Sequence, residues 1–293
     1  MKSRMNNKDN VDCAIKVCEL SHAFKEKSVL ETISFEIKKG EIFGLLGPSG
    51  AGKTTLINIL TGQITATGGS SEILGTSSSK LKGADYKKLG IMMDNFGLYE
   101  RMNCYDNLKF YQKLDGKSQD AIDEVLEGVG LLAAKKTQVM NLSKGMTNRL
   151  AFARAILRKP EVLFMDEPTS GLDPSTVEAI HKLIMEEKEK GTTIFLTTHN
   201  MYEAEKLCDT IALLNEGKIV EFGAPVDICR RYNHQKRLNI HLKNGEDVTL
   251  EHNKDCAEKL KEYFEKEEVE TIHSTEPNLE TIFMELTGRT LEL

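Results

Sequence analysis

The chain has 293 residues, with 39 basic and 45 acidic side chains, so its formal net charge is −6. Hydrophobic residues make up 40% of it and charged residues 29%, a composition that excludes a wholly disordered or collagen-like protein. At roughly 150 residues per domain, the length predicts about two domains. The acidic balance argues against nonspecific binding to nucleic acid, which depends on basic side chains.

Apolar runs in the sequence are short. Two of the longest, 162–165 and 211–214, fall far below the roughly 18 residues of a membrane-spanning helix. The polar start, 1–12, lacks the apolar core of a signal peptide, and we expect 1–10 to form a flexible tail. The six cysteines are scattered without a Cys-x-x-Cys pair, which favours free thiols. These features predict a cytoplasmic protein that does not cross a bilayer alone.

The first part of the chain predicts strands followed by a helix. Apolar and polar residues alternate at 33–37, which indicates a half-buried strand. A second strand, 41–46, runs into a glycine-rich turn, and a helix over 53–61 follows it. We expect 65–80 to be mainly loop, because it is rich in Gly, Ser and Thr, with a short strand near 72–74.

The middle of the chain, about 95–160, reads as a helical insertion. Apolar spacing is helical from 106 to 134, with Ile122, Leu126 and Val129 on one face. The elements that follow are a strand, a helix, a strand and a hairpin, at 161–165, 174–190, 192–198 and 211–222. Strands that alternate with helices predict an α/β core with parallel pairing.

The pattern changes after Pro225. A hairpin is expected across the turn Asn244-Gly245. It is followed by a charged helix, a short strand and a last helix, at 254–266, 269–272 and 279–286. We therefore predict a main domain over 11–225 and a small α+β domain over 226–293.

A phosphate-binding pattern lies between the second strand and the first helix. It fits G-x-x-x-x-G-K-[ST] and reads Gly47, Pro48, Ser49, Gly50, Ala51, Gly52, Lys53, Thr54, with Thr55 next. Its glycines let backbone N–H groups converge on phosphate oxygens, and the helix N-terminus adds partial positive charge. Lys53 would reach the β and γ phosphates of a nucleotide, and the Thr54 hydroxyl would ligate Mg²⁺. A structural glycine turn is the alternative, but the flanking strand and helix favour a phosphate site.

Two acidic residues follow the apolar strand at 161–165. Phosphoryl transfer needs an acid that supports the metal and a group that positions the attacking water. Asp166 is our candidate for Mg²⁺, and Glu167 is our candidate for the water. Taken alone, the pair could also be two solvated carboxylates at a strand end, and its combination with the phosphate-binding pattern favours the catalytic interpretation.

A third segment carries a family resemblance. Leu142-Ser143-Lys144-Gly145-Met146, followed by Arg149 and Ala153-Arg154-Ala155, resembles the signature segment of ATP-binding cassette (ABC) ATPases. Other segments of that family occur in the expected order, and the resemblance covers about 14–223. These other segments are Phe24, which matches the family's aromatic residue, Ser170-Gly171-Leu172-Asp173, which matches the D-loop, and His199, which matches the switch histidine.

This resemblance implies a fold, a cofactor and a second copy. The fold would be a P-loop NTPase core of the ABC type, with an antiparallel β subdomain and the helical insertion. Phe24 would stack on the adenine of ATP, and Lys53, Glu167 and His199 would serve hydrolysis. Ser143 and Gly145 would contact the γ-phosphate across a head-to-tail dimer, either a homodimer or a heterodimer with a related cassette.

Two departures from the family pattern occur. Asp94 stands where a glutamine is usual, and Lys144 and Met146 replace the usual glycine and glutamine of the signature. A carboxylate can ligate Mg²⁺ but cannot donate a hydrogen bond as an amide does. We therefore expect Asp94 to retain a metal contact and to change the metal affinity of the site.

The segment 279–288 resembles the ending of ABC-2 type exporter ATPases, including antibiotic and bacteriocin self-protection systems, and an amphipathic closing helix is the alternative. The exporter resemblance implies a membrane-spanning permease that would hold this chain at the inner face of the membrane. We expect the contact at 95–105, through Phe96, Leu98 and Tyr99. Internal packing of these three side chains is the alternative.

Two other classes of function are weighed. The first is a soluble ABC ATPase that acts on nucleic acid, ribosomes or cofactor assembly. The single set of motifs excludes the members of this class that have two fused cassettes. We expect no nucleic acid partner. The second is a P-loop kinase or GTPase, which gives no reason for the segment 142–154. The sequence therefore favours the ATPase subunit of a transporter.

Overall fold

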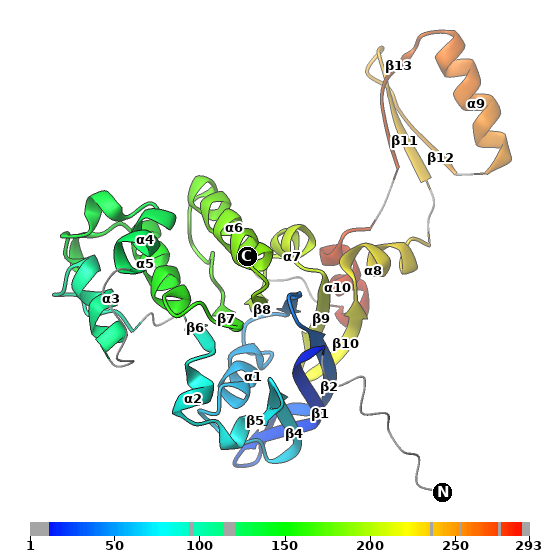
Figure 1. The fold of residues 1–293 in the computed structure, drawn as a ribbon. Coiled ribbons are helices and arrows are strands. Elements are labelled where there is room, and N and C mark those ends of the chain that lie inside the picture. The colour runs from blue at the N-terminus through cyan, green and yellow to red at the C-terminus, as the bar shows by residue number, and fades with distance from the viewer. Residues whose placement is uncertain are drawn as a thin grey trace, which may run out of the picture. The chain divides into compact units, whose positions relative to one another are not determined.

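The computed structural model describes residues 12–93, 97–113, 121–234, 237–251, 253–274 and 277–288. Figure 1 shows its elements. The chain divides into two compact units, Met1–Phe222 and Gly223–Leu293. The predicted tail at 1–10 and the predicted metal ligand Asp94 lie outside the described residues.

A six-stranded sheet forms the centre of the first unit, in the order β10-β9-β3-β8-β7-β6. Neighbouring strands from β9 to β6 are parallel. The bounds are β3 Ile42–Leu46, β6 Leu89–Met92, β7 Val162–Asp166, β8 Thr193–Thr198, β9 Thr210–Asn215 and β10 Lys218–Gly223. The strands predicted at 41–46, 161–165 and 192–198 are confirmed, as is their parallel pairing. The short strand β6 was not predicted, because four residues carry too little periodicity.

Phenylalanine rings join three strands of this sheet. Phe43 of β3 pairs in register with Phe195 of β8, and Phe195 pairs with Phe164 of β7. The ring centroids lie 5.3 Å apart in the first pair and 5.6 Å apart in the second. All three side chains are fully buried, so they hold the central strands together by apolar burial and ring contacts.

A second, antiparallel sheet has the order β2-β1-β4-β5. Its bounds are β1 Cys13–Phe24, β2 Lys27–Lys38, β4 Gly68–Ile73 and β5 Thr76–Ser77. Ile33, Phe35 and Ile37 are buried while the residues between them are exposed, which confirms the predicted alternation. The strand β4 is longer than the one predicted near 72–74, because its pairing with β1 orders Gly and Ser residues whose own strand preference is low.

Helices pack against both sheets. Helix α1 (Lys53–Leu60) contacts β7 of the large sheet and β4 of the antiparallel sheet, and Figure 1 shows it between the two. Helix α7 (Met201–Leu207) packs on β3 and β8. Two other helices of the first unit are α2 (Gly83–Tyr86) and α6 (Pro174–Glu189). The predicted helix at 53–61 and the start of a helix at Pro174 are confirmed.

The helical part of the first unit consists of several short helices. It contains α3 (Cys104–Lys113), α4 (Ala121–Gly128) and α5 (Lys144–Ile156), with 3-10 turns η3 (Leu132–Ala134) and η4 (Val139–Asn141) before α5. Ile122, Leu126 and Val129 are buried as predicted. The helical spacing from 106 to 134 does not belong to one element, because α4 ends at Gly128 and Gly130 has a φ of +68° that an α-helix does not allow.

The second unit contains a three-stranded antiparallel sheet in the order β12-β11-β13. Its elements are α8 Pro225–Arg231, β11 Arg237–Leu242, β12 Asp247–Glu251, α9 Lys254–Glu265, β13 Val269–Ser274 and α10 Leu279–Thr287. Ile240, Leu242, Leu250 and Cys256 form its core, and α8 contacts α10. The predicted hairpin and the elements after it are confirmed, and α8 is a helix that was not predicted. Within the described ranges, no helix is both long and apolar enough to cross a bilayer.

We predict that Phe195→Ala lowers the free energy of unfolding of the first unit by about 3–5 kcal/mol, because it leaves a cavity between Phe43 and Phe164. Denaturant unfolding of the full chain measures this loss. Met140→Ala is the control, since 61% of the Met140 side chain is exposed, and its expected effect is within about 0.5 kcal/mol. Equal losses in the two variants would contradict the role given to the phenylalanine contacts.

Candidate functional site

The predicted phosphate-binding loop connects β3 to α1. Strand β3 ends at Leu46, and α1 begins at Lys53. Gly50 and Gly52 have φ values of +80° and +111°, a conformation that costs little only for glycine. No side chain caps α1, so the N–H groups of its first turn are available to a bound anion.

Close packing adds a second requirement for glycine in this loop. A Cβ atom at Gly47 would lie 2.2 Å from the carbonyl oxygen of Leu214 in β9. A Cβ atom at Gly52 would lie 2.7 Å from Leu30 Cδ2 in β2. The loop is therefore enclosed by strands of both sheets, and Pro48, Ser49 and Ala51 occupy the positions between its glycines.

Lys53 folds back over the loop. Its Nζ donates to the carbonyl oxygens of Gly47 and Pro48, at 2.7 and 3.3 Å. The same Nζ lies 3.1 Å from Glu167 Oε1. Only 7% of the lysine side chain and 20% of the glutamate side chain are exposed, so this ion pair is little screened by solvent.

Asp166 is held at the carboxyl end of β7. Its Oδ2 accepts a hydrogen bond from Thr54 Oγ1 at 2.8 Å, and its Oδ1 accepts one from Thr197 Oγ1 at 2.5 Å. The Thr54 hydroxyl and the Asp166 carboxylate are oxygen ligands of the kind that Mg²⁺ prefers. These two adjacent residues fit the metal site that the sequence predicts at this position. Thr197 was missed by the sequence analysis, because it lies inside an apolar strand and only the β7–β8 register places it opposite Asp166.

Glu167 lies beside His199. Its Oε2 is 2.7 Å from His199 Nδ1, and since a carboxylate can only accept, Nδ1 carries the hydrogen. Glu167 has a φ of +50°, an uncommon conformation for a residue with a side chain. Its backbone N–H donates to the carbonyl and hydroxyl oxygens of Thr197, at 3.1 and 3.2 Å, so β8 holds this turn.

The structure thus brings five predicted residues together, namely Lys53, Thr54, Asp166, Glu167 and His199. Thr55 follows in the first turn of α1. Asp94, the remaining predicted metal ligand, lies outside the described residues.

Phe24 is the last residue of β1. Its side chain is 52% exposed, and its ring meets His22 edge-on with the centroids 4.6 Å apart. The exposed face is available for stacking on a planar group.

The signature residues belong to the start of α5. Ser143 is the N-cap of this helix and accepts from the backbone N–H of Met146 at 3.2 Å. A Cβ atom at Gly145 would lie 2.8 Å from Thr176 Cγ2 in α6. Among the described residues, neither Ser143 nor Gly145 makes a hydrogen bond to the phosphate-binding loop.

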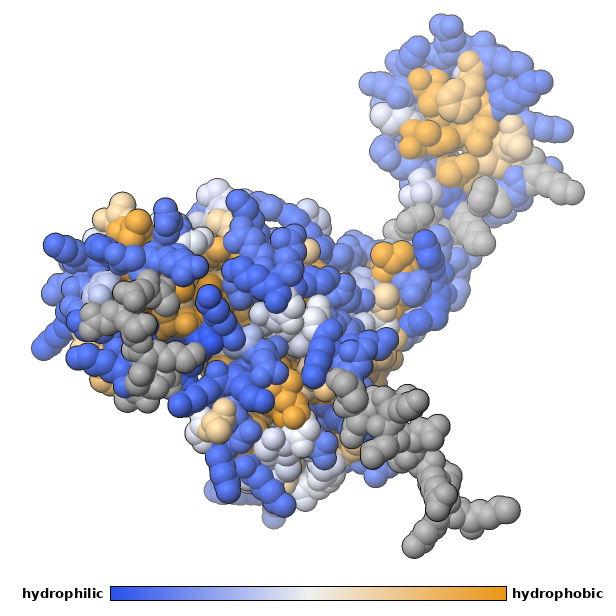
Figure 2. Space-filling model, in the orientation of Figure 1, coloured by the Kyte–Doolittle hydropathy of each residue, from blue (hydrophilic) through white to orange (hydrophobic). Residues whose placement is uncertain are grey.

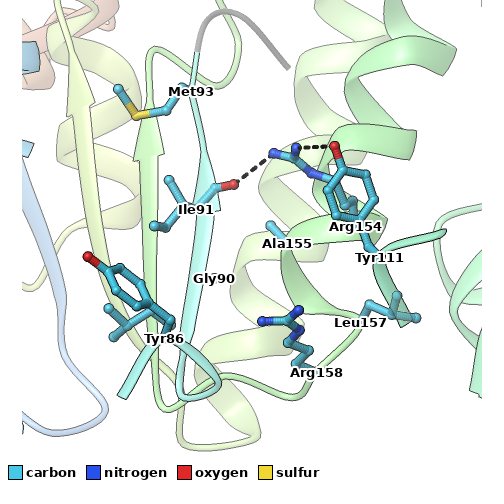
Figure 3. Close-up of a pocket in the computed structure, with 10 residues that line it drawn as sticks. Tyr86, Gly90, Ile91, Met93, Tyr111, Arg154, Ala155, Leu157 and Arg158 are labelled. Atoms are coloured by element: carbon cyan, nitrogen blue, oxygen red, sulfur yellow. Dashed lines mark hydrogen bonds between the residues drawn. The ribbon is translucent and has the colours of Figure 1, made fainter. Parts of the chain in front are cut away.

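A cavity of about 350 Å³ lies between β6 and α5. Figure 3 shows Arg154 at its side, directed toward the carbonyl of Ile91 and the hydroxyl of Tyr111. Arg154 donates to these two oxygens, at 3.0 and 3.4 Å. Met93, the last described residue before Asp94, also lines the cavity.

Three aromatic side chains lie together beside this cavity, and one of them, Tyr111, lines it. Tyr99 contacts Phe110 with centroids 4.9 Å apart and Tyr111 with centroids 6.3 Å apart. Tyr99 is 45% exposed and Phe110 is 36% exposed. We call Tyr99, Phe110 and Tyr111 the aromatic patch. Figure 2 shows hydrophobic surface in the helical part of the molecule, at the left of the view, among hydrophilic surroundings.

Comparison with known proteins identifies the family of the chain. The family model described as "ABC transporter" matches residues 30–170. The chain is 38% identical to the fluoroquinolones export ATP-binding protein of Mycobacterium tuberculosis, over 88% of this chain and 87% of that protein. It is 32% identical to the linearmycin resistance ATP-binding protein LnrL of Bacillus subtilis, over 93% of this chain and 97% of that protein. It is 38% identical to the bacitracin transport ATP-binding protein BcrA of Bacillus licheniformis, over 78% and 74%.

Solved structures show the same fold. CbiO1 from Clostridium perfringens, part of the ABC transporter complex cbiONQ, has a TM-score of 0.68 and 28% identity, over 74% of this chain and 90% of that one. The ADP conformation of MJ1267, an ATP-binding cassette, has a TM-score of 0.65 over 72% and 91%. The chain belongs to the ABC transporter family, and it is an ATPase of that family.

We predict that Gly47→Ala weakens nucleotide binding by about tenfold or more, because the added Cβ must displace either the loop or the Leu214 carbonyl, and misplaced phosphate-binding groups are costly. Titration with a fluorescent ATP analogue measures the affinity. Gly83→Ala is the control, since a Cβ there meets open space, and its affinity should equal that of the unmodified chain. Unchanged affinity in Gly47→Ala would contradict the tight packing described for this loop.

Proposed function

We propose that this chain is the ATP-binding and ATP-hydrolysing subunit of an exporter and powers a separate membrane-spanning permease. The observation that carries the proposal is the convergence of Lys53, Thr54, Asp166, Glu167 and His199 at one edge of the sheet. Relatives named for the export of fluoroquinolones and the transport of bacitracin support an exporter. The same relatives favour antibiotic-type compounds or peptides as the cargo.

Each residue of the site has a separate role in ATP binding or hydrolysis. The loop N–H groups and Lys53 bind the phosphates, and Phe24 stacks on the adenine. Thr54 and Asp166 would hold Mg²⁺, which neutralises charge on the phosphates when it is bound. Glu167 orients and polarises the attacking water, and His199 orients Glu167 through its Nδ1 hydrogen bond.

The Lys53–Glu167 ion pair shows what nucleotide binding must change. Lys53 Nζ lies between two loop carbonyls and Glu167 Oε1. A phosphate is the stronger attraction for an ammonium group, because it carries more negative charge. Binding of ATP therefore transfers Lys53 from Glu167 to the phosphates and leaves the carboxylate available to water.

A second cassette completes the site. Ser143 caps α5 and Gly145 lies in its first turn, where its neighbour is Thr176 of α6. We propose that Ser143 and Gly145 contact the γ-phosphate held by a second copy or by a related cassette. ATP would then close the pair and hydrolysis would release it, a switch driven by phosphate contacts.

The permease would dock beside the cavity between β6 and α5. The aromatic patch offers exposed apolar surface there, which a short helix of the permease can cover. Tyr99 belongs to the segment that the sequence predicts as the contact, while Phe96 lies outside the described residues. Docking would hold the chain peripherally at the inner face of the membrane. Relatives named for export and transport favour a permease partner over a soluble ABC ATPase.

We predict that Glu167→Gln retains ATP binding but lowers hydrolysis by about 10²-fold or more, because an amide cannot act as a base. The ATP-bound dimer should then accumulate, and size-exclusion chromatography with ATP and Mg²⁺ measures it. Lys53→Ala is the matched loss-of-binding variant and should remain monomeric. Turnover equal to that of the unmodified chain in either variant would refute the proposed function.

We predict that the double variant Tyr99→Ala and Phe110→Ala retains ATP hydrolysis by the purified chain but loses co-purification with membranes. The exposed rings are removed, whereas the site at the sheet edge is untouched. Phe264→Ala is the control, because it removes another exposed aromatic ring, in α9, and it should co-purify normally. Membrane co-purification of the double variant at the control level would argue against docking at the aromatic patch.

A further inference from the structure

Three polar side chains form a buried cluster behind the site. Glu203 of α7 is fully buried, and its Oε1 accepts a hydrogen bond from Thr169 Oγ1 at 2.8 Å. The same Oε1 lies 3.0 Å from Nε2 of His181 in α6. His181 is 3% exposed and Thr169 is 8% exposed. Since a carboxylate only accepts, both partners donate to it. Burial of a carboxylate is costly unless donors hold it. Both donors reach Oε1, whereas Oε2 has no hydrogen-bond partner among the described residues, so Thr169 and His181 are the groups that hold this carboxylate.

The cluster lies between the two segments that carry the reacting groups. Thr169 follows Glu167 by two residues, and Glu203 follows His199 by four. The parallel ladder between β7 and β8 reaches only to the pair Asp166 and Thr197. Beyond that pair, the backbone N–H of Glu167 still donates to the Thr197 carbonyl and Thr198 still pairs with Leu46 of β3. The residues after Glu167 and after His199 are outside the sheet, and side chains connect these two segments.

Hydrogen bonds lead from Glu203 back to His199. The backbone N–H of Glu203 donates to Asn200 Oδ1 at 3.1 Å, which caps α7. The backbone N–H of Asn200 donates to Thr198 Oγ1 at 3.0 Å. His199 therefore lies in a turn whose two neighbours are both fixed, and Glu203 anchors the helix that follows.

The turn after Glu167 is held from a further side. Asn148 of α5 is buried and donates from Nδ2 to the carbonyl oxygen of Pro168 at 2.8 Å. The positive φ of Glu167 needs such restraint, because this conformation persists only where the surroundings impose it. Thr169 is held in the same turn by its side chain, whose partner is Glu203.

We propose that Thr169 and Glu203 are positioning residues for hydrolysis, and that their hydrogen bond connects the two turns so that Glu167 and His199 keep their direct contact. His181 holds the Glu203 carboxylate in the orientation that receives the threonine. The inference rests on the proposed function, because it concerns the same site. It adds a requirement that the motifs do not contain, namely a buried contact between the helix after the switch histidine and the turn after the catalytic glutamate.

The test compares variants of Thr169 in the full chain. Thr169→Val keeps the shape and removes the hydroxyl, so kcat should fall about tenfold to a hundredfold, as expected when a reacting group is misplaced. The KM for ATP should change less than about twofold, since the phosphate-binding loop is untouched. Thr169→Ser restores the donor and should restore kcat. Glu203→Gln keeps an acceptor oxygen and should retain most of the activity.

Thr192→Val is the matched control. It also removes a buried threonine hydroxyl, which donates to the Pro160 carbonyl at 3.3 Å next to the start of β8, far along the strand from the site. Its kcat should stay unchanged. Thermal unfolding of each variant shows whether it is folded, so a loss of kcat in a folded variant is a loss of positioning. If Thr169→Val does not fold, Thr169→Ala is tested in its place.

The outcomes are distinct. Wild-type kcat in folded Thr169→Val, or equal kcat losses in Thr169→Val and Thr192→Val, would overturn this inference. So would a failure of Thr169→Ser to restore activity. If the unmodified chain and Lys53→Ala show the same absence of ATP hydrolysis, the proposed function itself fails.

Discussion

The parallel pairing of β3, β8 and β7 is the constraint on which the site depends. Leu46 is opposite Thr198 in one pair of strands, and Asp166 is opposite Thr197 in the other. The three strands therefore end at the same edge of the sheet. The residue after each strand is Gly47, His199 or Glu167, so three chain segments far apart in sequence deliver their functional groups to one place. The buried phenylalanines of these strands keep that alignment.

Much of this arrangement could be predicted from the sequence. The phosphate-binding pattern carries its own geometry, because glycines at fixed spacing between a strand and a helix have few alternative uses. Asp166 and Glu167 could be identified because they lie at the end of an apolar run and accompany the phosphate-binding pattern, whereas His199 was assigned through the resemblance to ABC ATPases. The alternation of strand and helix patterns along the chain also predicted the parallel sheet, whose strands are the same apolar runs.

The rest depends on register and burial, which no local pattern contains. Thr197 and Glu203 look like ordinary strand and helix residues in the sequence, and only the fold places them against Asp166 and Thr169. The end of α4 could not be predicted, because helical apolar spacing continues past Gly128 although the helix ends there. The helix α8 escaped prediction because seven residues after a proline give a weak periodic signal.

The ion pair between Lys53 and Glu167 also bears on how the protein responds to its solvent. Exposed pairs such as Lys206 with Glu178 lie in water, where dissolved salt weakens them. The pair in the site is mostly enclosed by protein, and mobile counterions have little access to it. Ordinary changes of ionic strength should therefore leave the resting state of the lysine intact, so its release depends on a ligand that can enter the loop rather than on the surrounding electrolyte.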